Sequence, residues 1–104
     1  MSSQETNFIE VKPRTHEEWE QDMKSYILIR LNKKEKLIEV RIMGYDRKVI
    51  ADYKGKFPED IYYKIIKDGH ITKLQHAAYL GNELQKVYLA IKLDKDYVQD
   101  ENLL

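Results

Sequence analysis

Two runs of alternating apolar and polar residues constrain the fold of this chain more than any other feature. Residues 25–31 and 37–43 each place branched apolar side chains at every second position, and a charged turn separates the two runs. Period-two alternation of branched residues is typical of half-buried β-strands. These runs predict two antiparallel strands with a shared apolar face. A third strand is expected over residues 48–54, with one face formed by Val49, Ala51 and Tyr53.

Two helices are predicted after the strands, and they would cover the apolar face of the sheet. Pro58 suits the first turn of a helix and Gly69 suits a left-handed C-terminal position, so a helix is expected between them. A second helix is expected over residues 73–93, with a capping box formed by Thr72 and Gln75 at its start. Recurrence every three or four positions predicts that its core-facing stripe consists of Leu74, Ala77, Ala78, Gly81, Leu84, Tyr88 and Ile91.

The predicted fold class is therefore α+β, a three-stranded antiparallel meander covered on one face by two helices. A chain of 104 residues fits one small domain, which we place at residues 20–104. Residues 1–19 are expected to form an N-terminal arm. Within this region, Thr15 and Glu18 have the spacing of a capping box, which predicts a short helix near residues 16–23.

The composition excludes several classes of function. Eighteen basic residues balance eighteen acidic ones, which argues against a dedicated nucleic-acid binder and against a polybasic membrane-binding segment. The chain has no cysteine, so disulfides, thiolate zinc sites and cysteine nucleophiles are excluded. The longest apolar run covers residues 26–29, far below the ~20 residues that span a bilayer. With no signal-peptide pattern at its start, the chain is expected to be cytoplasmic, without a membrane partner.

The segment from His76 to Glu83 is the most unusual part of the longer predicted helix. Gly81 lies in the helix interior, where glycine costs ~1 kcal/mol relative to alanine. Either this glycine and the neighbouring alanines let another backbone approach closely, or a ligand or cofactor lies against the helix. His76 and Glu83 are seven residues apart, hence on one helical face, with Tyr79 between them.

A histidine and a carboxylate on one face could shuttle a proton or hold a metal ion. The alternative is a locally hydrogen-bonded His76 and a solvated Glu83. Their spacing is wider than the i, i+4 pair that zinc proteins use on a helix, so no metal site is assigned. The sequence identifies no cofactor. It also contains no glycine-rich phosphate loop and no nucleophile elbow, so no catalytic residue is assigned.

Eight tyrosines in so short a chain indicate an interaction surface. Together with Arg30, Arg41 and Arg47 they could stack on nucleic acid, or they could form a protein interface. The neutral charge favours the protein interface, because tyrosine and arginine are enriched at such contacts. A homo-oligomer or another protein partner is therefore expected. The small core, which no disulfide reinforces, would also gain stability from such pairing.

Several stretches of this sequence resemble a domain of unknown function found in archaea and cyanobacteria. The resemblance covers roughly residues 20–102, and its most specific parts are residues 76–84, His-Ala-Ala-Tyr-Leu-Gly-Asn-Glu-Leu, and residues 97–100, Tyr-Val-Gln-Asp. That domain occurs alone or at the C-terminal end of dihydropteroate-synthase-like, pterin-binding proteins. The resemblance implies an association with pterin or one-carbon metabolism but no established activity. It draws attention to His76, Tyr79, Gly81, Glu83, Tyr97 and Gln99 as ligand-binding candidates.

Two functions follow as hypotheses. The first is a non-catalytic binding or assembly module, associated with pterin or one-carbon metabolism and not expected to be an enzyme on its own. The second is a small-ligand-binding protein or enzyme with a site beside the helix over residues 73–93, which uses His76, Tyr79 and Glu83. These hypotheses differ in whether His76, Tyr79 and Glu83 face a ligand or make contacts only within the fold.

Overall fold

The computed structural model describes residues 25–44 and 46–100. The predicted arm over residues 1–19 and the short helix near residues 16–23 lie outside the described residues. The described part contains three strands followed by two helices, so the predicted α+β class and its element order are confirmed. No helix among the described residues is long and apolar enough to cross a membrane.

The sheet is an antiparallel meander in which β2 (Leu37–Gly44) lies between β1 (Ser25–Asn32) and β3 (Val49–Gly55). The pairing of Ile29 with Val40 and of Val40 with Tyr53 puts the predicted apolar face on one side of all three strands. The side chains of Ile38, Val40 and Ile42 in the central strand are fully buried. The alternation in the sequence therefore located the core-facing side of the sheet.

One register detail of β3 differs from the prediction. The pairing shifts between Ile42 and Met43, because Ile42 pairs with Ala51 whereas Met43 pairs with Val49. The irregularity adds a residue to β3, so Val49 leaves the face that Ala51 and Tyr53 share, and about half of it is exposed. The prediction that Val49 lies on that face was wrong, because simple alternation cannot foresee a bulge.

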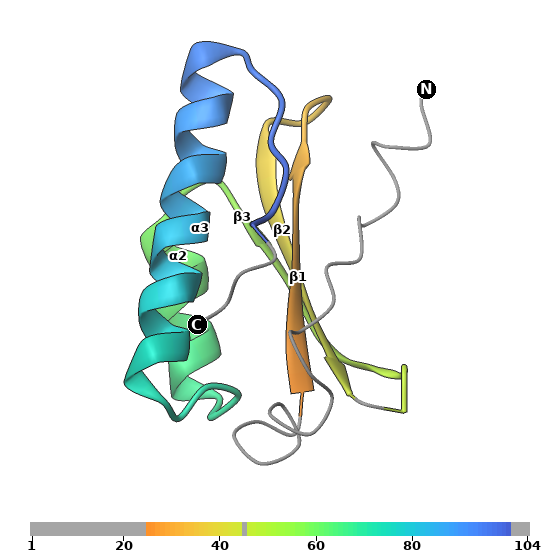
Figure 1. Ribbon diagram of the computed structural model, residues 1–104. Helices are drawn as coiled ribbons and strands as arrows, with labels where there is room; N and C mark the ends of the chain where they lie inside the picture. The colour runs from red at the N-terminus through yellow and green to blue at the C-terminus, as the bar shows by residue number, and fades with distance from the viewer. Residues whose placement is uncertain (1–24, 45, 101–104) are drawn as a thin grey trace.

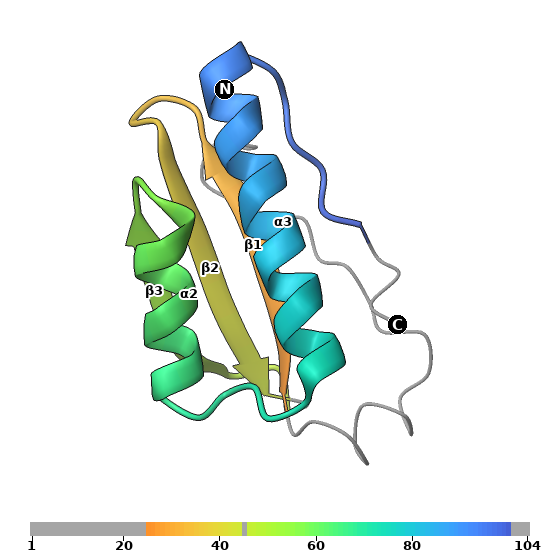
Figure 2. The ribbon, with the colours of Figure 1, turned by 90° about the vertical axis from the view of Figure 1, so that its left-hand side faces the viewer.

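Both helices cover the same face of the sheet, as seen edge-on in Figure 1 and from the helix side in Figure 2. Helix α2 (Pro58–Lys67) begins with the predicted proline, and Gly69 has a φ of 81° after its end. Helix α3 (Leu74–Leu93) ends at Asp94, whose left-handed conformation (φ 54°) lets the N–H of Lys95 donate to the carbonyl of Ala90 at 2.8 Å. The residues after Asp94 turn back alongside α3 near β1 (Figure 2).

Two predictions about α3 were wrong. Its N-cap is Lys73, without a side-chain capping bond, so Thr72 and Gln75 form no capping box. The predicted core stripe is also rotated around the helix, since Leu74 and Ala78 are exposed. The buried residues of α3 are His76, Tyr79, Leu80, Glu83, Leu84, Val87 and Ala90.

Candidate functional site

The buried carboxylate of Glu83 is the centre of a polar network between α3 and the C-terminal segment. Only 1% of Glu83 is exposed, so the alternative of a solvated glutamate was wrong. Its Oε1 accepts hydrogen bonds from the hydroxyl of Tyr97 (2.6 Å) and the backbone N–H of Asp100 (3.2 Å). Its Oε2 accepts one from the ammonium of Lys86 at 2.7 Å. Three donors therefore compensate for the desolvation of this charge.

Gln99 fastens the same segment to the edge of the sheet. Its side-chain oxygen accepts the N–H of Ile29 (2.9 Å), and its side-chain N–H group donates to the carbonyl of Ile27 (3.0 Å). Ile27 and Ile29 belong to the edge strand β1. The amide of Gln99 therefore makes the hydrogen bonds to their backbone groups that a further strand would otherwise make. Residues 95–100 form no regular strand themselves.

The hydroxyl of Tyr79 joins the two halves of the network. It donates to the backbone carbonyl of Asp100 and accepts from the side-chain amide of Gln99 at 2.8 Å. Burial raises the pKa of Tyr79 well above its ordinary value. Burial and then the hydrogen bond to Glu83 also raise the pKa of Tyr97 strongly. Both phenols therefore stay protonated at neutral pH and act as donors.

The structure brings four of the six predicted site residues into this network: Tyr79, Glu83, Tyr97 and Gln99. His76 is buried on the same side of α3, two turns before Glu83. Gly81 instead faces α2, where a Cβ atom would lie 3.6 Å from the ring of Tyr62. That is an ordinary contact distance, and the neighbour is a side chain, so the proposed close approach of another backbone was wrong.

Sequence reasoning missed two contributors to the network, Lys86 and the backbone of Asp100. The signal for Lys86 was available, because it follows Glu83 by three residues and therefore lies beside it on a helix. The backbone contact of Asp100 has no such signal, because seventeen residues separate it from Glu83. No group of three or more metal-ligating side chains occurs within residues 25–44 and 46–100.

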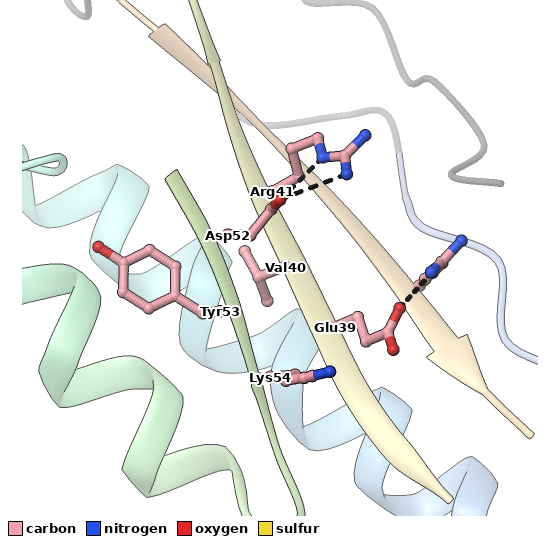
Figure 3. A pocket seen from close by; sticks show the side chains of 7 residues that line it. Glu39, Val40, Arg41, Asp52, Tyr53 and Lys54 are labelled. Atoms are coloured by element: carbon pink, nitrogen blue, oxygen red, sulfur yellow. Dashed lines mark hydrogen bonds and ion pairs between the residues drawn. The ribbon is translucent and has the colours of Figure 1, made fainter. Parts of the chain in front are cut away.

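A second polar region lies on the sheet face opposite the helices. Arg41 binds Asp52 through its Nε at 2.8 Å, Glu39 pairs with Arg30, and Tyr53 points to the other side of the sheet (Figure 3). The hydrogen bond to Asp52 raises the pKa of Arg41. These residues border a hollow of about 250 Å³. Opposite charges across neighbouring strands satisfy one another here, and the predicted site residues lie elsewhere.

Comparison with protein families matches residues 21–100 to PterinBD-DUF4346. The chain belongs to this family. The PterinBD-DUF4346 match covers both parts of the network, α3 and the segment up to Asp100, and it confirms the resemblance found from the sequence. Comparison with solved structures gave no match.

Relatives of this PterinBD-DUF4346 chain are themselves uncharacterised. An uncharacterised protein of Methanocaldococcus jannaschii is 36% identical over 75 residues, which cover 72% of this chain but only 14% of that protein. The uncharacterised protein ycf91 of Porphyra purpurea is 34% identical over 85 residues, 76% of this chain and 70% of the relative. The ycf91 protein of Pyropia yezoensis is 30% identical over 99 residues, 89% of this chain and 85% of the relative. The domain thus matches both a much longer protein and proteins of similar size.

Proposed function

We propose that this chain is a non-catalytic binding and assembly module that works beside a pterin-binding protein. The single observation that carries this proposal is the state of four candidate site residues, Tyr79, Glu83, Tyr97 and Gln99. Their polar groups bind one another and the backbone, and they hold the C-terminal segment against α3 and β1. A side chain whose donors and acceptors already have partners within the chain stabilises the fold, and few of its polar atoms remain to bind a substrate.

The burial of Glu83 supports this reading most directly. Both carboxylate oxygens accept hydrogen bonds from within the chain, and 1% exposure leaves almost no surface for a ligand atom. The side-chain amide of Gln99 likewise has partners at both ends. A proton shuttle needs a group within hydrogen-bond reach of its substrate, and these groups are covered.

The association with pterin binding rests on the family and on size. The family description joins a pterin-binding label to a domain of unknown function. The chain matches only 14% of the longer archaeal relative, so that relative has ample chain for a separate catalytic unit. In our proposal the small domain serves such a unit by contact, whether fused to it or as a separate chain.

The test has two arms. In the first, thermal denaturation of the chain is followed with pterin, folate, nucleotides and divalent cations. A ligand at a hundred times its Kd would stabilise the folded chain by about 2.7 kcal/mol. Because we propose no small-molecule site, we expect none of these compounds to raise the Tm by a comparable amount. In the second, the chain is mixed with a dihydropteroate-synthase-like protein from the same organism, and we expect co-elution on a sizing column.

The alternative function, a ligand site or active site that uses His76, Tyr79 and Glu83, makes the opposite prediction in the first arm. A pterin that stabilises the wild-type chain but not Glu83→Gln would establish that site and overturn our proposal. Glu83→Gln keeps the size of the side chain, so the comparison isolates the charge. A chain that neither co-elutes with the pterin-binding protein nor binds a ligand would also contradict the proposal.

A further inference from the structure

We propose that residues 1–24, the segment that precedes β1, dock on the sheet face opposite the helices. We call this surface the far face, and it carries Tyr26, Leu28 and Arg30 of β1 and Glu39, Arg41 and Met43 of β2. The inference goes beyond the proposed function and does not depend on it, because it concerns contacts within one chain.

The apolar side chains of the far face are buried although both helices lie on the other side of the sheet. Tyr26, Leu28 and Met43 are 6%, 4% and 9% exposed. Among residues 25–44 and 46–100, no helix or strand lies on the far face (Figure 1). A sheet face that meets water leaves large apolar side chains partly exposed, so a further layer covers these three.

Two ion pairs on the same side of the sheet show how far this layer extends. In the pair that joins β1 to β2, the side chains of Arg30 and Glu39 are 17% and 12% exposed. In the pair that joins β2 to β3, the side chains of Arg41 and Asp52 are 36% and 55% exposed. Val49 of β3 is also half exposed. The layer therefore covers β1 and the adjoining part of β2 and leaves β3 open.

The place of residues 1–24 in the chain identifies them as this layer. They are joined directly to Ser25, the first residue of β1, which is next to Tyr26. Eight extended residues match the length of β1, about 27 Å, so a segment of 24 residues is long enough to return along it. Residues 101–104 follow Asp100, which bonds to α3 on the other side of the sheet. Four residues extend at most about 14 Å, too little to cross the edge and cover two strands.

The composition of residues 1–24 complements the far face. The segment contains six acidic residues against three basic ones, and the whole chain is neutral, so residues 25–104 have an excess of three basic residues. Opposite net charges favour association of the segment with the rest of the domain. The segment also supplies large apolar side chains that could cover the buried residues of the far face: Phe8, Ile9, Val11, Trp19 and Met23.

Energy transfer from the single tryptophan tests this placement in the full chain. Trp19 lies within residues 1–24, and the chain has no cysteine, so a fluorescent acceptor can be attached at one engineered thiol. Val49→Cys puts the acceptor beside the far face, and Leu89→Cys, at a similarly exposed position, puts it on the outer side of α3. We expect higher transfer to the acceptor at position 49. Equal transfer, or higher transfer to position 89, overturns the proposal.

The second measurement tests whether the far face itself holds the segment. In the folded wild type, Trp19 should emit at shorter wavelength than in urea and resist quenching by acrylamide. Leu28→Glu should remove part of this protection, because it places a charge beneath the segment, and Leu89→Glu is the matched control that should retain it. If circular dichroism shows that Leu28→Glu does not fold, Leu28→Ala takes its place. Trp19 emission that is the same in the folded chain and in urea, or that a folded Leu28 variant leaves unchanged, overturns the proposal.

A concentration series separates docking within one chain from docking on a second copy. The protection of Trp19 should be present at concentrations where sedimentation shows a monomer. Protection that appears only together with dimers would assign the far face to a neighbouring copy and overturn the proposal. None of these outcomes affects co-elution with a pterin-binding protein, so the two proposals are tested separately.

Discussion

The hydrogen bonds of Gln99 to β1 yield the sharpest prediction about stability. Gln99→Ala removes the acceptor for the N–H of Ile29 and the donor to the carbonyl of Ile27. Both residues are almost completely buried, so their backbone groups would lose partners where water has little access. The same substitution removes the hydrogen bond that Tyr79 accepts from Gln99.

The expected loss follows from these contacts. A buried backbone group left without a partner costs about 1–3 kcal/mol, so two such groups cost about 2–6 kcal/mol. A domain of this size has a free energy of unfolding of about 5–15 kcal/mol. The loss would therefore lower the Tm by at least about 8 °C. Gln99→Glu should also destabilise the chain, because a carboxylate cannot donate to the carbonyl of Ile27 and would place a charge at a buried position.

Urea denaturation followed by circular dichroism measures the free energy of unfolding, and hydrogen exchange measures the protection of the Ile29 amide. Gln99→Ala should destabilise the chain and accelerate exchange at Ile29. Val98→Ala changes the exposed neighbour on the same segment and should stay within about 0.5 kcal/mol of the wild type. If Gln99→Ala is as mild as Val98→Ala, the C-terminal segment does not secure the edge of β1 and the reasoning fails.

Two further predictions concern α3 and its network. Gly81→Ala should raise the free energy of unfolding by about 0.5–1 kcal/mol in thermal or urea denaturation, because alanine suits a helix interior and its Cβ would contact the Tyr62 ring at 3.6 Å. A loss of stability would show that α2 and α3 pack more tightly than this contact implies. Burial raises the pKa of both Tyr79 and Tyr97 in the folded state, so the unfolded chain releases these protons first. Stability should therefore be constant with respect to these groups below about pH 10 and fall above it, by up to about 1.4 kcal/mol per pH unit for each tyrosine. Urea titrations at several alkaline pH values should show a shallower fall for Tyr97→Phe, and an unchanged slope would contradict the burial of that phenol.

The strands and the fold class could be predicted because their information is local. Alternation fixes which side of Ile38, Val40 and Ile42 faces the core, and Pro58 and Gly69 mark the ends of α2. The orientation of α3 could not be read in the same way. Its apolar residues recur on two opposite sides, so spacing alone cannot say which side is buried.

The sequence identified residues of the candidate site, but it did not show what these residues do. Tyr79, Glu83, Tyr97 and Gln99 stood out individually, but their mutual hydrogen bonds depend on how the chain turns back after Asp94. That turn brings together residues fourteen to twenty positions apart. A buried glutamate on a core-facing helix is costly without donors, and the donors come from a segment whose position no local pattern specifies.

The two sides of α3 differ in what the fold requires of their side chains. On the inner side, polar residues such as Glu83 are tolerated because the C-terminal segment supplies their partners from the same chain. On the outer side, the apolar Leu89 and Leu93 are exposed together with the charged Lys92. A substitution at Glu83 must therefore replace specific buried hydrogen bonds, whereas an exposed outer residue can exchange its contacts with water. The stability of this domain should accordingly depend far more on Glu83 than on Leu89.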